Sequence, residues 1–202
     1  MKLYHSPGAC SLAPHIVLRE AGLAFELVLA STKTHQLPDG SSYYDINPLG
    51  YVPLLELDDG TRLREVPAIV QYLADQVPNR NLAPASGTLP RYRLQEWLTF
   101  IGTELHKQFG PLFKPDLPDE AKAFFRKRLH ERFPWVDQQL AGRPYLLGEH
   151  FGVADAYLFT VTRWGPAIQL DLEALPNLKA HHERVAARPA VQEALKAEGL
   201  LK

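Results

Sequence analysis

The residue with the clearest chemical potential is Cys10, which is the only cysteine in the chain. It follows the turn signal Ser6-Pro7-Gly8 and directly precedes a helical pattern that starts at Ser11. A thiol at a helix N-terminus faces unpaired backbone N–H groups and the positive end of the helix dipole, and both favour the thiolate. A thiolate is a strong nucleophile that enters disulfide exchange. With no second cysteine its disulfide partner must come from outside the chain, and a small cytosolic thiol is the obvious candidate. The competing interpretation is that Cys10 is a small buried apolar residue.

Two other features could serve the same chemistry. Ser11 could cap the helix or donate its hydroxyl to a nearby sulfur, and capping is the simpler interpretation. Val52-Pro53 precedes a strand pattern, and a cis bond there would turn the Val52 N–H and C=O outward to pair with an extended peptide ligand. The chain contains 17 prolines, and the sequence alone does not identify a cis bond among them.

His181-His182-Glu183 raises the question of a metal site. Adjacent residues on a helix point about 100° apart, so these side chains do not form a ligand pair. The chain also lacks a His-Glu-x-x-His motif. We therefore expect a solvated helix face at residues 181–183 and no metal.

The charge balance makes one class of partner improbable. The 202 residues carry 22 Lys and Arg against 23 Asp and Glu, which gives a formal net charge of −1. Without a basic excess, nucleic acid is not an expected partner. The first residues lack the apolar run of a signal peptide, and no stretch approaches the ~18 apolar residues of a membrane helix. A lone cysteine forms no disulfide framework of the kind found in secreted proteins. Together, these features lead us to expect a cytoplasmic protein with no membrane partner.

The elements that must position these residues follow from hydrophobic spacing and turn signals. Strands are expected at residues 2–5, 25–29, 52–57 and 61–64, and helices at residues 11–22 and 67–77. Residues 78–90 hold three prolines with Asn, Ser and Gly, which indicates a linker. Long helical patterns follow at residues 91–113, 119–141, 151–168 and 176–195. Strands first and helices afterwards predict an α+β domain at residues 1–77, the linker at 78–90, and an all-helical domain at 91–202.

Four segments together resemble the thioredoxin fold as glutathione transferases use it, and most closely the bacterial beta class. The segments are MKLYHSPGACSLAPHIVLRE (1–20), INPLGYVPLLELDDG (46–60), AIVQYLAD (68–75) and FGVADAYLF (151–159). The resemblance covers the whole chain. It implies a thioredoxin-like, glutathione-binding N-terminal domain, an all-α C-terminal domain with a site for a hydrophobic electrophile, a homodimer, and no requirement for a metal.

The resemblance also implies a set of site residues. The catalytic candidates are Cys10, Ser11 and His106, and the glutathione-binding candidates are His35, Val52, Pro53, Glu65, Val66, Thr99, Glu104 and Lys107. Cys10 matches the position that contacts the glutathione thiol and can form a mixed disulfide with it. Val52 matches the backbone clamp before a cis-proline, and Glu65 matches the acid near the γ-glutamyl end. His106 and Lys107 match side chains that reach toward the sulfur, and Glu104 matches a residue offered by the neighbouring subunit.

Three positions depart from the family pattern. Val66 stands where Ser or Gly is usual, so it keeps a backbone N–H for a carboxylate but lacks a hydroxyl, and its bulk is expected to crowd the ligand. His35 stands where a lysine commonly meets the glycine carboxylate, and Lys33 is near enough to substitute. Thr99 stands where an asparagine is common. These changes are expected to weaken glutathione binding.

Other residues receive structural or secondary roles. Asp155, in the motif that resembles the family's helix start, is expected to accept backbone N–H bonds there. Tyr4, Phe109, Phe113 and Trp164 could line the apolar pocket for the electrophile, although most aromatics at such spacings belong to a core.

The function that follows is attack of the glutathione thiolate on a hydrophobic electrophile, or glutathione-dependent disulfide exchange through Cys10. A first alternative is a glutathione-dependent thiol reductase or dehalogenase, in which Cys10 would be essential. A second alternative is a non-catalytic ligand carrier or interaction protein of the same fold, which the departures at Val66 and His35 keep open.

Overall fold

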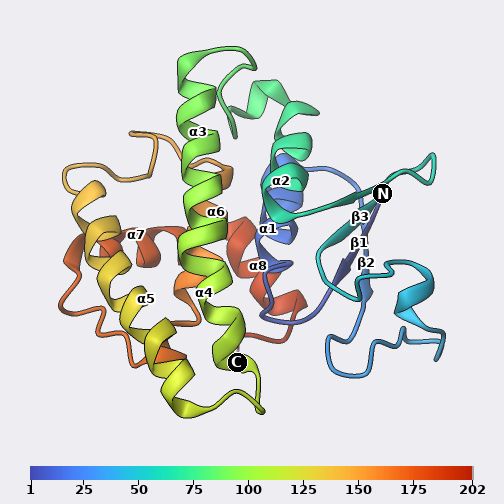
Figure 1. Cartoon of the computed structure of the whole chain (residues 1–202). Coiled ribbons are helices and arrows are strands. Elements are labelled where there is room, and N and C mark those ends of the chain that lie inside the picture. The colour runs from blue at the N-terminus through green and yellow to red at the C-terminus, as the bar shows by residue number, and fades with distance from the viewer. Residues whose placement is uncertain (202) are drawn as a thin grey trace. The chain divides into compact units, whose positions relative to one another are not determined.

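The computed structural model describes residues 1–201, and these residues form two compact units. The first unit contains Met1–Leu82 together with the segment from Arg188 onward, and the second contains Ala83–Ala187. The first unit holds the whole sheet, and the second is helical among the described residues (Figure 1). The predicted fold class, a thioredoxin-like α+β domain followed by a helical one, is confirmed.

The sheet of the first unit has four short strands in the order β2-β1-β3-β4. They are β1 (Lys2–His5), β2 (Glu26–Leu29), β3 (Leu54–Glu56) and β4 (Arg62–Arg64). β1 pairs in parallel with β2 and antiparallel with β3, and β3 pairs antiparallel with β4. The hairpin turn predicted at Asp58-Asp59-Gly60 therefore joins β3 to β4. All four strands lie where they were predicted, with bounds shorter by up to two residues at an end.

Three helices belong to the same unit: α1 (Leu12–Ala21), α2 (Val66–Asp75) and α8 (Pro189–Ala197). α1 ends at Gly22, whose φ of 67° is the left-handed conformation that glycine adopts without a steric penalty. α8 packs on α1, with Val191, Ala194 and Leu195 buried. The last helix of the chain is therefore part of the unit that carries Cys10.

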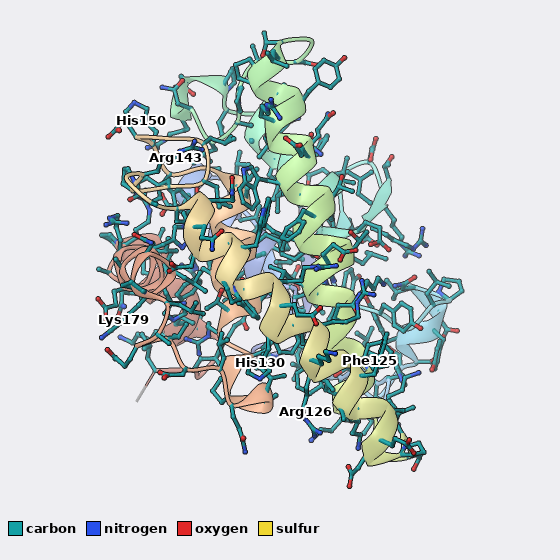
Figure 2. The ribbon with its side chains drawn as sticks, turned by 60° about the vertical axis from the view of Figure 1, so that its left-hand side comes forward. Phe125, Arg126, His130, Arg143, His150 and Lys179 are labelled. Carbon is teal, nitrogen blue, oxygen red and sulfur yellow. The ribbon has the colours of Figure 1, made fainter. Side chains whose placement is uncertain are left out.

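The helical unit begins with a long, irregular helical stretch. This stretch comprises α3 (Leu89–Phe100), a π-helical segment (Ile101–His106), α4 (Lys107–Phe109) and a 3₁₀ turn (Gly110–Phe113). α5 (Asp119–Gln139), α6 (Val153–Thr162) and α7 (Pro176–Ala186) complete the unit. Every residue of α6 is buried, which makes α6 the centre of this core. Figure 2 shows Arg126 and His130 on α5 and Lys179 on α7.

Two predictions of organisation are corrected at the C-terminus. The pattern at residues 176–195 is two helices, because Pro189 excludes the helical conformation at Arg188, which has an extended ψ of 135°. The helical domain expected at 91–202 also ends earlier as a compact unit, at Ala187, because the apolar face of α8 packs on α1. The expected linker at 78–90 contains a 3₁₀ turn (Pro78–Arg80) and the start of α3.

The start of α6 behaves as predicted, whereas the histidine pair does not. Asp155 accepts hydrogen bonds from the backbone N–H of Gly152 at 2.8 Å and of Leu146 at 2.9 Å. His181 is buried, and its Nε2 donates to the same carboxylate at 2.9 Å. The expectation of a solvated face at residues 181–183 is therefore wrong for His181, because an inward-facing position on α7 pairs it with Asp155.

No helix within residues 1–201 is long and apolar enough to cross a membrane.

Candidate active site

Cys10 lies in the turn between β1 and α1, as its sequence position predicts. Its side chain is half-buried, and Sγ lies 3.1 Å from the backbone carbonyl oxygen of Val52. A carbonyl only accepts, so the thiol proton must point at this oxygen. The sulfur is thereby held beside the residue that the family resemblance assigns to the glutathione backbone.

Ser11 plays a different part from the one expected. Its hydroxyl is buried, makes no cap hydrogen bond at the start of α1, and donates instead to the carbonyl of Ser6 at 3.2 Å. The backbone N–H of Ser6 donates back to the same hydroxyl oxygen at 3.1 Å. The capping interpretation is therefore wrong: Ser11 closes the turn that carries Cys10. A hydrogen bond from Ser11 to the ligand sulfur stays a prediction.

The same turn is also held by a buried hydrogen-bond network that was not predicted from the sequence. The network consists of Glu198, His15 and Arg19. Glu198, at the end of α8, accepts hydrogen bonds from the backbone N–H of Gly8 at 2.9 Å and from His15 Nδ1 at 2.8 Å. His15 Nε2 accepts from Arg19 Nε at 3.0 Å, and because arginine only donates, the His15 proton must sit on Nδ1. Burial lowers the pKa of nearby His5, which keeps that imidazole neutral beside the carboxylate. No local motif signals a contact between residues so far apart in the chain.

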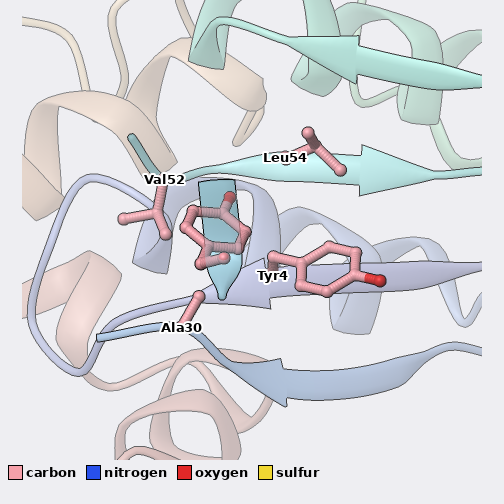
Figure 3. Packing of buried hydrophobic residues seen from close by; sticks show 5 residues of the cluster. Tyr4, Ala30, Val52 and Leu54 are labelled. Atoms are coloured by element: carbon pink, nitrogen blue, oxygen red, sulfur yellow. The ribbon is translucent and has the colours of Figure 1, made fainter. Parts of the chain in front are cut away.

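The Val52–Pro53 peptide bond is cis, in agreement with the resemblance. Val52 is buried and belongs to the hydrophobic cluster on one face of the sheet, together with Tyr4, Ala30, Tyr43 and Leu54 (Figure 3). Its carbonyl accepts from Cys10, and its N–H has no hydrogen-bond partner among residues 1–201. An unpaired N–H next to the cysteine is the kind of group that an extended peptide ligand requires.

The start of α2 offers a second backbone donor. Glu65 precedes the helix with a φ of +66°, its side chain is exposed, and Val66 is the first helical residue. The first N–H groups of a helix lack intrahelical partners and favour anions. Val66 is only 2% exposed, so its isopropyl group packs into the core, which argues against the expectation that its bulk crowds the ligand.

His35 lies in a strained loop position. Its φ is +53°, its ring packs on Tyr44 with centroids 4.7 Å apart, and its buried Nδ1 has no hydrogen-bond partner in the described part of the chain. Gly50 lies directly against this pair, because a Cβ built there would be 2.9 Å from His35 Nδ1 and 2.7 Å from the Tyr44 ring. Lys33, the expected substitute, is exposed.

In the helical unit, His106 ends the π-helical segment. Its Nδ1 lies 2.6 Å from the hydroxyl of Tyr157, and its ring lies 5.1 Å from that of Trp164 between centroids. Burial, with a smaller effect of Lys107, lowers the pKa of His106 to about 4. His106 is therefore neutral at pH 7, so it can serve a ligand as a hydrogen-bonding group and not as a cation.

The other predicted residues of this unit lie on the same stretch. Thr99 and Lys107 are exposed. Glu104 is half-buried and is engaged within its own chain, where its carboxylate pairs with Arg132 at 2.9 Å and Arg128 at 3.3 Å on α5. The hydrogen bond from Arg132 is the largest cause that lowers the pKa of Glu104, so this side chain is ionised at pH 7.

The aromatic residues divide between two environments. Phe109, Phe113 and Trp164 form one cluster, with ring centroids 5.5 to 6.2 Å apart, and the Phe113 side chain is exposed. This cluster adjoins His106 through Trp164 and presents an apolar surface. Tyr4 does not belong with it: Tyr4 is buried in the first unit and packs on Tyr43, so its assignment to the pocket is corrected to the core.

Each unit thus brings together one set of predicted residues. The first unit brings Cys10 and Val52 together, and His35 and Glu65, both with positive φ, belong to the same unit. The second gathers His106 with three aromatic side chains. A sulfur beside the Val52 backbone can bind a thiol-containing peptide, and an apolar surface beside a neutral histidine can accept a hydrophobic molecule.

Comparisons with known proteins agree with this chemistry. Residues 8–76 match the glutathione S-transferase N-terminal domain, and residues 100–189 match the C-terminal domain. Glutathione S-transferase GstA of Escherichia coli O157:H7 is 50% identical over 200 residues, which cover 99% of this chain and 100% of the relative.

Solved structures agree as well. A sphingomonad glutathione S-transferase complexed with glutathione has a TM-score of 0.95 and 48% identity, and a bacterial beta-class enzyme from Sphingomonas chungbukensis has a TM-score of 0.96 and 48% identity; each covers 100% of both chains. With both domains matched and half of its residues identical to those of a named member, the chain belongs to the glutathione S-transferase family, beside bacterial beta-class enzymes.

Proposed function

We propose that this transferase joins the thiol of glutathione to hydrophobic electrophiles, and that Cys10 also supports glutathione-dependent disulfide exchange. The observation that carries the proposal is the N–H of Val52, which has no partner within residues 1–201 and belongs to a residue whose carbonyl oxygen lies 3.1 Å from Cys10 Sγ. A tripeptide thiol that pairs with the Val52 backbone would bring its own sulfur toward Cys10. The family membership supplies the identity of that tripeptide.

In this proposal, each charged group of glutathione has a partner of complementary charge on the protein. The γ-glutamyl carboxylate suits the backbone N–H of Val66 at the positive end of α2, and the ammonium suits the carboxylate of Glu65. The glycine carboxylate suits His35 or Lys33. Lys107, Thr99 and His106 are the polar side chains that the helical unit offers, and the cluster of Phe109, Phe113 and Trp164 is proposed to receive the electrophile.

The conjugation step transfers no electrons to or from the protein. The glutathione thiolate attacks an electrophilic carbon, a C–S bond forms, and the leaving group departs with the electron pair of its broken bond. In disulfide exchange, the Cys10 thiolate attacks a glutathione disulfide, one S–S bond replaces another, and a glutathione thiolate leaves. The positive end of α1, which begins two residues after Cys10, favours a thiolate at this position in both steps.

We further propose that the protein is a cytoplasmic homodimer. In the family pattern, the residue at the position of Glu104 contributes to the glutathione site of the neighbouring subunit. Its carboxylate already pairs with Arg128 and Arg132, which holds it in one orientation before any partner binds. Light scattering at micromolar concentration should therefore give twice the chain's mass, and a mass of one chain would contradict the dimer.

Titration calorimetry with glutathione tests the binding proposal, and a screen of aromatic and aliphatic electrophiles tests conjugation. Cys10→Ala then separates the two activities: conjugation should persist, and disulfide exchange should be lost. Loss of both activities would favour the reductase or dehalogenase alternative, in which Cys10 is essential. A wild-type protein that does not bind glutathione would favour the non-catalytic alternative.

A further inference from the structure

We infer that Tyr43 and Asn47 aim the backbone N–H of Val52 at the ligand by holding the carbonyl of the preceding residue, Tyr51. The inference rests on the proposed function, in which this N–H binds the glutathione backbone. Tyr43 and Asn47 lie in the loop between β2 and β3 and are absent from the site residues that the sequence predicts.

Two buried side chains converge on one carbonyl oxygen. The Tyr43 hydroxyl donates to the Tyr51 oxygen at 2.9 Å, and Asn47 Nδ2 donates to the same oxygen at 2.7 Å. Tyr43 is fully buried and Asn47 is 1% exposed, whereas Tyr51 itself is 65% exposed. The segment that meets solvent is thus tied from the interior through its backbone.

The carbonyl of Tyr51 and the N–H of Val52 belong to the same planar trans peptide, so they point in opposite directions. Two donors on the oxygen side therefore fix the direction of the N–H on the other side. Hydrogen bonds in a chain also polarise one another, and an amide whose oxygen accepts two bonds is a stronger donor at its nitrogen. Tyr43 and Asn47 thus set both the aim and the strength of the Val52 donor.

The orientation of both side chains is itself determined by neighbours. Arg64 Nε donates to Asn47 Oδ1 at 2.9 Å, and because arginine only donates, the amide nitrogen of Asn47 must face Tyr51. The Asn47 backbone is fixed as well, with its N–H donating to Tyr43 O and its carbonyl accepting from Gly50 N–H, both at 2.8 Å. Burial raises the pKa of Tyr43 to about 12, so its hydroxyl keeps its proton throughout the working pH range.

Tyr43→Phe is the decisive variant, because it removes one hydroxyl oxygen and keeps the buried ring. We expect glutathione to bind roughly three- to tenfold more weakly, since one hydrogen bond that orients the amide is lost. KM for glutathione should rise by the same factor, and kcat at saturating glutathione should change less than twofold. The ¹⁵N–¹H resonance of Val52 should move upfield, which a role confined to stability would not produce. Tyr72→Phe is the matched control, because it removes a hydroxyl from a half-buried tyrosine on α2 that does not contact Tyr51 through a hydrogen bond among the described residues. Its glutathione affinity should stay at the wild-type value.

Asn47→Asp tests the second donor. Aspartate keeps an oxygen for Arg64 but places its other oxygen against the Tyr51 carbonyl, so repulsion replaces a hydrogen bond. Binding should weaken more than in Tyr43→Phe. A folded Tyr43→Phe variant with unchanged glutathione affinity, or with an unshifted Val52 resonance, would overturn the inference. Wild-type protein that fails to bind glutathione would instead overturn the proposed function, and that measurement precedes the variants.

Discussion

The backbone N–H of Gly8 donates a 2.9 Å hydrogen bond to a carboxylate oxygen of Glu198, which lies 190 residues further along the chain. The other oxygen of the same carboxylate accepts from His15 on α1. Glu198 thus joins the end of α8 to the turn that presents Cys10 and to the helix that follows it. The reactive turn is held in place by the last residues of the fold as well as by its own sequence.

Glu198→Gln should destabilise the protein by about 3 kcal/mol, because a buried carboxylate that accepts two bonds is replaced by a group that accepts only on one side. Glutathione affinity should fall as well, since the Gly8 turn loses its anchor. Urea unfolding measures the first effect and titration calorimetry the second. Glu193→Gln is the control: its side chain is on the same helix, is 65% exposed and pairs with Arg19, so less than ~1 kcal/mol is expected. Equal losses in both variants would contradict the anchoring role.

Stability should fall as the pH drops from about 6.5 toward 4. Burial lowers the pKa of both His106 and His182 to about 4 from an ordinary 6.5, so between these values the unfolded chain binds more protons than the folded chain. Protons then favour unfolding, and the loss is complete once the pH is below both values. Urea unfolding at pH 7, 6 and 5 measures the slope. His182→Gln should make the slope shallower, and an unchanged slope would show that other groups dominate.

Gly50→Ala should weaken glutathione binding through His35. The φ of +67° strains any side chain at residue 50, and the added Cβ would press on the His35 imidazole and the Tyr44 ring. Gly60→Ala is the matched control, because its φ of +83° imposes the same kind of strain with no atom within 4 Å of the new Cβ. Both variants should lose about 1 kcal/mol of stability from the backbone. A fall in glutathione affinity in Gly50→Ala alone would place His35 at the ligand. Equal glutathione affinities in Gly50→Ala and Gly60→Ala would exclude His35 from the binding site.

Val66→Thr should leave glutathione affinity within about twofold of wild type. The hydroxyl of the threonine replaces a methyl group that faces the core, so it should not reach the carboxylate that the backbone N–H receives. Stability should fall by about 1–3 kcal/mol, because a hydroxyl would be buried without an assured partner. Calorimetry and urea unfolding measure the two quantities. Tighter binding would mean that the side chain turns outward, as the family pattern alone suggests.

His35→Lys should tighten glutathione binding about three- to tenfold if the glycine carboxylate lies at this loop, since a permanent cation replaces a histidine. Lys33→Gln tests the competing position, because its side chain is exposed and its removal should matter only if Lys33 now binds the carboxylate. Isothermal titration at low and high salt distinguishes a charge effect from a loop rearrangement. Affinity that is unchanged in both variants would place the carboxylate elsewhere.

The sequence by itself determined the elements and the family. Turn residues and hydrophobic spacing depend on neighbours a few positions away, and they located all four strands, α1, α2 and the position of Cys10 between a strand and a helix. The motifs around Cys10, Val52 and Asp155 carried the family resemblance for the same reason. Helix ends also followed local rules, although the break at Pro189 was missed.

Only the tertiary structure decided what the side chains face. Val66 turns into the core of the first unit, and Ser11 turns toward Ser6 to close its own turn. The charge of His106 depends on burial by its surroundings, and the contacts of Glu198 with Gly8 and of Tyr43 with Tyr51 depend on how loops and helices pack. Local sequence fixes the backbone conformation, but the direction of a side chain and its protonation state depend on contacts that form only when the chain folds.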